Sequence, residues 1–118
     1  MTTEAPKFKL AIEDILTVRV KIQLLSGGVW KKFDYTLFAK RMDQDAVTIT
    51  HKEDGEQPVA EFVQKVATGW EGQRLVLNDD NTPAAFDPEA LKALLSVPGV
   101  ATLTYQAYMR DLGAREKN

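Results

Sequence analysis

The sequence contains 118 residues, of which 44% are hydrophobic and 27% charged, with a formal net charge of -2. This length fits one domain, expected to span residues 1–118, and the composition is that of a folded chain rather than a disordered one. The lack of cysteine excludes disulfides, thiolate metal sites and cysteine nucleophiles, and the acidic balance disfavours binding to a phosphate backbone. Neither a signal-peptide pattern nor a run of roughly 18–20 apolar residues occurs, so we expect no secretion and no membrane insertion.

The N-terminal half predicts strands. Residues 1–7 lack an apolar period and are expected to form a loose arm, followed by a β-rich part over residues 8–50. Apolar and polar residues alternate over residues 18–25, Ser26-Gly27-Gly28 predicts a tight turn, and a return strand follows over residues 29–39. The apolar face of this hairpin is made by Val18, Val20, Ile22 and Leu24 on one arm and by Phe33, Tyr35, Leu37 and Ala39 on the other. An isolated hairpin is marginal in water, so this face is expected to pack against the helices downstream.

The middle of the chain leaves two interpretations open. Residues 46–50 have β propensity and favour a short strand, whereas Met42-Asp43-Gln44-Asp45 is equally compatible with a helical turn. Residues 52–56 form a polar connection that contains a glycine.

A helical part is predicted over residues 58–112. Its first helix begins at Pro58, carries an apolar stripe and ends at Gly69, so that Trp70 folds back onto the helix. The stripe consists of Val59, Phe62, Val63 and Val66. Residues 75–77 are expected to be extended and residues 78–83 to form a turn.

The second helix has the best-marked start. Asp87 is a good N-cap, Pro88 suits the first helical position, and Glu89 favours the positive end of the helix dipole. Leu91, Leu94 and Leu95 are expected to point into the core.

A third helix is predicted over residues 100–112, after the break at Val97-Pro98-Gly99. One stripe of this helix holds Val100, Leu103, Ala107 and Tyr108, and a neighbouring stripe holds Tyr105, Met109 and Leu112. Gly113 is a candidate C-cap, and residues 113–118 form a charged tail. The predicted fold class is therefore α+β, with an N-terminal antiparallel hairpin or small sheet packed against about three C-terminal helices.

The sequence shows no pattern typical of a catalytic or metal site. His51 is the only histidine, and the adjacent carboxylate pairs (Glu13-Asp14, Glu53-Asp54 and Asp79-Asp80) lie among polar residues, as on a solvated surface. Residues 78–89 have carboxylates and side-chain oxygens at calcium-loop spacing, but Pro83 stands where the loop needs glycine. We therefore predict no catalytic residue, no metal site and no cofactor, and we expect a protein that is not an enzyme.

Two surface features remain. Lys31-Lys32 and Lys40-Arg41, with Trp30 and Phe33 nearby, suggest a basic patch, but charges on the wet face of a strand explain them better, so nucleic acid is not a predicted partner. Apolar positions exceed what the core requires, and Trp, Tyr and Met are favoured at interfaces. These positions are Trp70, the stripe over residues 59–66, and the second stripe of the last helix. The pattern favours an interaction protein.

Several short motifs occur together in a particular order. The N-terminal half has Phe8-Lys9-Leu10, the strand pair around Ser26-Gly27-Gly28, and Phe38-Ala39-Lys40-Arg41-Met42. The C-terminal half has Glu61-Phe62-Val63, Gly69-Trp70-Glu71-Gly72, the segment from Phe86 to Leu91, Leu94-Leu95, Pro98-Gly99-Val100, Tyr108 and the ending Arg115-Glu116-Lys117-Asn118. In this order, over nearly the whole chain, the sequence resembles a family of tail assembly chaperones of long-tailed bacteriophages and prophages. It departs from the family at Asn81, where glycine is expected, and at residues 47–50, which are more strand-like.

The resemblance implies a non-enzymatic protein of the bacterial host cytoplasm that binds the long, aggregation-prone tape measure protein. It would keep that protein soluble while tail tube subunits assemble around it, and it leaves open whether the tail tube protein is also bound. We expect the contact residues to be Trp70, Tyr105, Tyr108, Met109 and Leu112. The alternative is a structural or adaptor subunit that stays in the finished tail.

Overall fold

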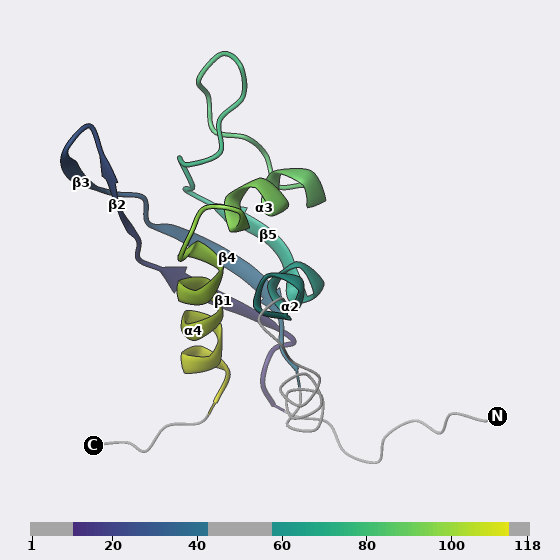
Figure 1. Ribbon diagram of the computed structural model, residues 1–118. Coiled ribbons are helices and arrows are strands. Elements are labelled where there is room, and N and C mark those ends of the chain that lie inside the picture. Colours follow the sequence, from purple (N-terminus) through teal and green to yellow (C-terminus); the bar gives the residue numbers. More distant parts are fainter. Residues whose placement is uncertain (1–10, 43–57, 114–118) are drawn as a thin grey trace.

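The computed structural model describes residues 11–42 and 58–113, and the predicted α+β class is confirmed (Figure 1). Antiparallel strands come first and most of the helical residues lie toward the C-terminus. The elements in chain order are β1 (Ile15–Val20), β2 (Gln23–Ser26), β3 (Val29–Lys32), β4 (Tyr35–Lys40), α2 (Pro58–Val66), β5 (Ala67–Glu71), α3 (Pro88–Leu95) and α4 (Val100–Leu112). The predicted arm at residues 1–7, the predicted strand at residues 46–50, His51 and residues 114–118 of the predicted tail lie outside the described residues.

The predicted hairpin is present, but each of its arms is divided into two strands. β1 pairs antiparallel with β4, and further out β2 pairs antiparallel with β3. At the division, Asp34 Oδ1 accepts a hydrogen bond from Ile22 N at 3.0 Å, and Phe33 N donates to Ile22 O at 2.9 Å. The side chain of Asp34 thus takes a main-chain donor that a continuous ladder would use, and β2–β3 becomes a separate two-stranded sheet.

The predicted end of the first helix is wrong. α2 stops at Val66, and the chain passes directly into β5, which pairs antiparallel with β4 to give the sheet order β1-β4-β5. Gly69 is therefore not a helix cap: it lies within β5, opposite Phe38. The main-chain groups of residues 67–71 find partners on β4 rather than in another helical turn, so the part predicted as helical contains a strand.

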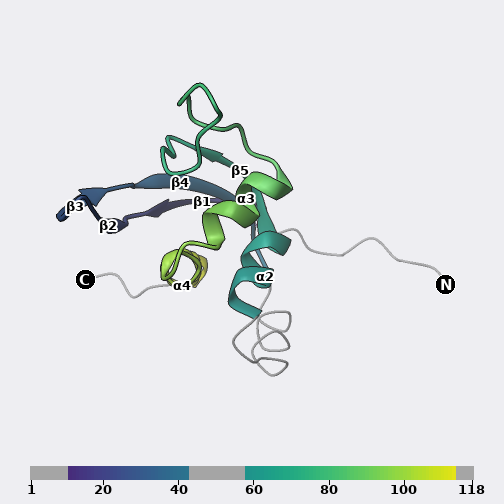
Figure 2. The ribbon, with the colours of Figure 1, turned by 45° about the horizontal axis from the view of Figure 1, so that its top comes forward.

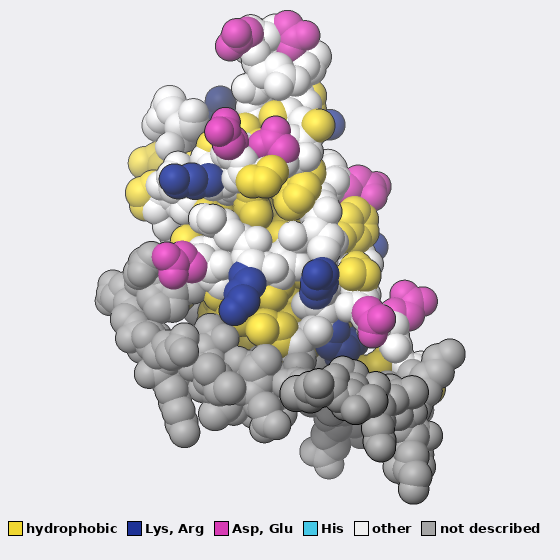
Figure 3. All heavy atoms as spheres, turned by 90° about the vertical axis from the view of Figure 1, so that its right-hand side faces the viewer, with side chains coloured by type: hydrophobic (Ala, Val, Ile, Leu, Met, Phe, Trp, Pro, Cys, Tyr) yellow, Lys and Arg dark blue, Asp and Glu magenta, His cyan; other side chains and the backbone are white. Residues whose placement is uncertain are grey.

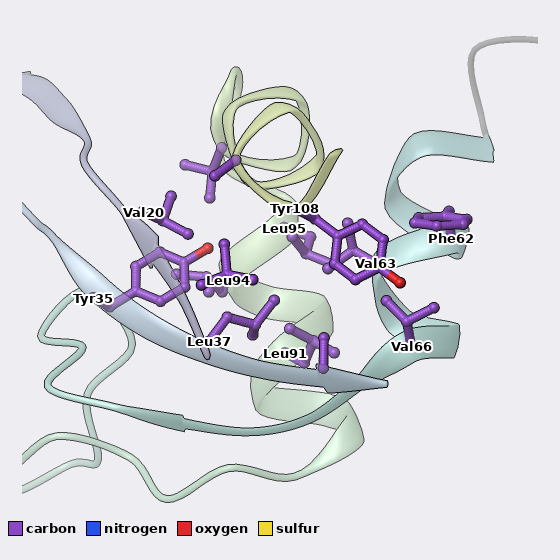
Figure 4. Packing of buried hydrophobic residues seen from close by; sticks show 14 of the residues in the cluster. Val20, Tyr35, Leu37, Phe62, Val63, Val66, Leu91, Leu94, Leu95 and Tyr108 are labelled. Atoms are coloured by element: carbon purple, nitrogen blue, oxygen red, sulfur yellow. The ribbon is translucent and has the colours of Figure 1, made fainter. Parts of the chain in front are cut away.

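The helices of the described residues, α2, α3 and α4, all lie on the same side of the β1-β4-β5 sheet (Figure 2). The strands contribute alternate side chains to the core and the helices contribute one stripe each, as Figure 4 shows from close by. The buried strand residues are Leu16, Val18, Val20, Tyr35, Leu37 and Ala39, and the buried helix residues include Phe62, Val63, Val66, Leu91, Leu94, Leu95, Val100, Ala107 and Tyr108. Leu103, which the sequence places on one stripe with Val100, Ala107 and Tyr108, is 41% exposed, whereas the other three residues are buried.

The starts of the last two helices agree with the sequence. Asp87 Oδ1 accepts a hydrogen bond from Ala90 N at 2.8 Å, and Pro88 occupies the first turn of α3. Gly99 precedes α4 with a φ of 89°, a value that residues other than glycine rarely adopt. Both predicted helices therefore begin at the expected residues.

One buried polar contact joins the sheet to the last helix. The Tyr35 hydroxyl on β4 is hydrogen-bonded to Thr104 Oγ1 on α4, and both residues are buried. Each hydroxyl satisfies the other where water cannot reach, so the pair fixes α4 against β4.

Candidate interaction surfaces

Trp70, a predicted contact residue, anchors a loop in this structure. It lies on β5 and is half-buried; its ring packs edge-to-face on Phe86 with 5.3 Å between centroids, and Nε1 donates to Ala84 O at 3.1 Å. The prediction that Trp70 folds back onto α2 is replaced by this role, because Trp70 ties residues 84–86, just before α3, to the edge of the sheet.

The same loop depends on Gln73, a residue that no sequence pattern singles out. Gln73 is 2% exposed, and its side chain makes four hydrogen bonds with main-chain groups. Nε2 donates to Val76 O at 2.9 Å and to Ala84 O at 3.1 Å, while Oε1 accepts from Leu75 N and Val76 N. Trp70 and Gln73 thus converge on one carbonyl oxygen, and no local pattern marks such a glutamine beforehand.

Tyr108, a second predicted contact residue, belongs to the core. It is 1% exposed; its hydroxyl donates to Lys40 O at 2.6 Å and accepts from Met42 N at 3.2 Å. Its ring lies edge-on to Phe62, with 5.4 Å between centroids. Tyr108 holds α4 to the end of β4, and in this position it offers no surface to a partner.

Tyr105, Met109 and Leu112, the other predicted contact residues, form a half-buried stripe on α4. All three pack against the core, and the Tyr105 ring lies edge-on to Phe62 at 5.4 Å. We call these three residues the helix surface. Because they are partly exposed, they remain candidates for contact with a partner protein, although much of each side chain is packed against the core.

The most exposed large hydrophobic side chains of the described residues lie elsewhere, on β2 and β3. Trp30 is 64% exposed, Leu25 60% and Val29 59%. Leu25 and Trp30 lie on one face of the two strands and Val29 on the other, and we call Leu25 and Trp30 the hairpin surface. Leu25 and Trp30 face each other in the antiparallel register, and in Figures 1 and 2 the hairpin stands away from the helices. Alternation and aromatic content are visible in the sequence here, but the division of the strands that leaves these residues outside the core is not.

The hairpin is closed by the turn that the sequence predicts. Gly27 and Gly28 have φ values of 60° and 79°, and positive φ at both central residues is typical of a type I′ turn. This turn matches the twist of the flanking strands and holds Leu25 opposite Trp30.

The basic residues that could suggest a patch do not come together as one unit. Lys31 and Lys32 are exposed on β3, whereas Lys40 and Arg41 lie at the far end of β4. Arg41 is committed to the fold, because Nε donates to Glu13 O and Nη1 to Leu112 O, both at 3.2 Å. Only the lysines of the hairpin remain near Trp30.

The acidic turn is held by its own hydrogen bonds. Asp80 Oδ1 accepts from Thr82 Oγ1 at 2.6 Å and from Thr82 N at 3.1 Å, and these bonds lower the pKa of the Asp80 carboxyl. Asn81 has a φ of 68°, the left-handed conformation that the turn needs and asparagine tolerates. In the part of the chain that the structure describes, no three His, Cys, Asp or Glu side chains are placed to hold a metal ion.

Charged and apolar side chains alternate over the face that carries this turn. Figure 3 shows hydrophobic side chains in small groups between charged ones, with acidic side chains at the top of the loop. Within residues 11–42 and 58–113, no helix is long and apolar enough to cross a membrane.

Comparison with known proteins finds no counterpart: no family model matches the sequence, and no curated protein and no solved structure is significantly similar to it. The residues and their arrangement are therefore the basis on which a function can be proposed.

Proposed function

We propose that this protein is a non-enzymatic phage tail assembly chaperone that binds the tape measure protein in the cytoplasm of the bacterial host. Two observations support the proposal. The order of motifs along the chain resembles that family, and the structure presents exposed apolar side chains on a folded scaffold. The hairpin surface is the single structural feature that carries the proposal, because Leu25 and Trp30 are largely exposed and lie outside the core.

A chaperone that keeps another chain soluble needs apolar surface that is available before the client arrives. Folded monomers rarely expose large apolar side chains together unless these serve recognition. β2 and β3 place two such side chains, Leu25 and Trp30, opposite each other, and the helix surface offers further, partly covered area on α4. A client that binds the hairpin surface would remove from water the apolar side chains whose exposure is least favourable in the free protein.

The proposal is tested by producing the protein together with the tape measure protein of the same phage or prophage. We expect the tape measure protein to be soluble and to co-purify. A Leu25→Ser/Trp30→Ser variant should lose this effect. A Leu77→Ser/Leu103→Ser variant is the matched control, because it removes two exposed apolar side chains outside the hairpin.

The alternative, a structural or adaptor subunit, makes the opposite prediction for finished tails. Recovery of this protein in purified tails, with a tape measure protein that stays insoluble in its presence, would overturn the chaperone proposal. Absence from finished tails together with soluble co-purification would support it.

A further inference from the structure

The segment that carries the outer hairpin, residues 21–34, has a net positive charge. Residues 21–34 contain three lysines and one aspartate, a local net charge of +2 on a chain whose total is -2. Asp34 is already engaged by the hydrogen bond from Ile22 N. Among the described residues, Lys21, Lys31 and Lys32 form no ion pair. The hairpin therefore offers free positive charge beside exposed apolar side chains.

The register places this charge on a definite face. Leu25 pairs with Trp30, and Gln23 pairs with Lys32 two positions along the strands. Side chains two residues apart point to the same face and are about 7 Å apart, so Trp30 and Lys32 are neighbours, while Lys31 and Val29 lie on the opposite face. Lys32 also borders an open hollow of about 480 Å³, which is lined by Lys21, Ile22, Gln23, Lys32 and Asp34.

We infer that this face of the hairpin binds a protein segment in which a large apolar side chain has a carboxylate about 7 Å away. The apolar group lies on Leu25 and Trp30, and the carboxylate lies in the hollow at Lys21 and Lys32. The inference rests on the proposed function, because it gives the chemistry of the client segment: acidic residues interspersed with large apolar ones. The charge on the hairpin favours such a segment over a basic one.

A second copy of the chain fits this face less well. Contact between two hairpins through this face would bring the Lys32 side chains of both copies together, and like charges disfavour that contact. An anionic membrane is also less suitable. Ser26, Gly27 and Gly28 form the tip, so insertion would take main-chain polar groups of the turn into lipid before Leu25 and Trp30 reached it.

The test uses the full chain and two labelled peptides of about 16 residues with the same leucine and phenylalanine positions. One peptide carries glutamate at its charged positions and the other carries lysine. By fluorescence anisotropy at low salt, the acidic peptide should bind at least about tenfold more tightly, and the difference should shrink at roughly 0.5 M salt. Equal binding of the two peptides would overturn the inference.

Neighbouring residues on opposite faces supply matched variants. Lys32→Glu should weaken binding of the acidic peptide about tenfold, whereas Lys31→Glu, which changes the same charge on the other face, should weaken it less than about threefold. Trp30→Ser should cost about thirtyfold and Val29→Ser less than about threefold. All four side chains are exposed, so the variants should keep the fold, which circular dichroism checks.

Other occupants would be recognised in the same experiments. Trp30-dependent binding to vesicles of phosphatidylcholine and phosphatidylglycerol, without peptide binding, would overturn the inference in favour of a membrane. Trp30-dependent self-association in light scattering would overturn it in favour of a second copy. If the protein bound both peptides equally but the tape measure protein still co-purified, this inference would be wrong and the proposed function would stand. If the protein preferred the acidic peptide but the tape measure protein did not co-purify, the proposed function would be wrong and the preference of the hairpin would stand.

Discussion

Two buried tyrosines show how single hydroxyl groups connect the sheet to α4. Burial raises the pKa of Tyr35 to about 12, against the opposing effect of its hydrogen bond with Thr104, and burial is also the main cause that raises the pKa of Tyr108. Both hydroxyls are therefore neutral in the folded protein well above neutral pH. The sequence places Tyr35 on the apolar face of the hairpin, and Tyr35 is buried as this face requires. The partners of the two hydroxyls could not be predicted, because they come from distant segments, and for the same reason the sequence suggests an interface for Tyr108 rather than the core.

The pKa of Tyr35 predicts a loss of stability in alkaline solution. Up to about pH 10, tyrosine is neutral in both states, so this group gives the free energy of unfolding no dependence on pH. Between about pH 10 and 12 the unfolded tyrosine ionises while the folded one stays neutral, and stability falls by up to about 3 kcal/mol. Urea unfolding of the wild type and of Tyr35→Phe across this range should show a shallower decline in the variant.

Tyr108 contributes to the same decline, so the matched comparison is Tyr35→Phe/Tyr108→Phe, in which most of the loss above pH 10 should disappear. At neutral pH, Tyr35→Phe should cost about 1–2 kcal/mol because Thr104 loses its buried partner. Adding Thr104→Val should recover part of that cost. A decline above pH 10 as steep in Tyr35→Phe as in the wild type would contradict this account.

Trp70 has a structural role that changes how its substitution should be interpreted. Trp70→Ala removes the contact with Phe86 and the hydrogen bond to Ala84 O, and should lower the free energy of unfolding by about 2–3 kcal/mol. Trp70→Phe keeps an aromatic ring and should cost only about 1 kcal/mol. Thermal unfolding measures both. Equal stability of Trp70→Ala and the wild type would show that the side chain is not needed by the loop.

At the scale of elements, local signals predicted α3, α4 and the hairpin turn well. Asp87, Pro88 and Gly99 act through neighbours within four residues, so their effect is visible in the sequence. β5 was missed because the partner that defines it is β4, about 30 residues earlier, and Gly69-Trp70-Glu71-Gly72 has the composition of a loop. The division of the hairpin was missed for a similar reason, since the side chain of Asp34 competes with the ladder only after the strands have met.

The cap of α3 can be tested directly. Asp87→Ala removes the acceptor for Ala90 N and should destabilise the protein by about 1 kcal/mol, whereas Asp87→Asn should cost less because the amide oxygen can still accept. Chemical denaturation measures the difference. Identical midpoints for Asp87→Ala and Asp87→Asn would mean that the hydrogen bond contributes little.

For the molecule as a whole, the fold separates into a core and a projecting hairpin. The core lies between the β1-β4-β5 sheet and the three helices, and β2–β3 adds only the half-buried Leu24 to it. The candidate contact surface could be predicted only in part. Sequence patterns identify apolar residues, but which of them remain exposed depends on how the helices cover the sheet, and this depends on contacts between distant segments.

This separation predicts that the hairpin can be removed without loss of the fold. Phe33 N donates to Ile22 O at 2.9 Å, the hydrogen bond that closes a β-turn, so an Asn-Gly pair can replace residues 23–32 between them. We expect the shortened protein to fold cooperatively with a loss of about 1–2 kcal/mol, mainly from Leu24. A Leu94→Ala variant, which opens a cavity in the buried core, should lose about 3 kcal/mol.

We expect peptide binding to respond to these two changes in the opposite way from stability. The shortened protein should fail to bind the acidic peptide and to keep the tape measure protein soluble, whereas Leu94→Ala, studied below its unfolding temperature, should bind normally. Calorimetry and peptide titration on the same samples measure the stability and the binding.

If the shortened protein unfolded, the hairpin would be part of the core. If it folded and still bound the peptide, the contact would have to lie on another surface, and the helix surface would be the next to examine. A folded protein without binding would assign stability to the core and recognition to the hairpin, as the exposure of Leu25 and Trp30 indicates.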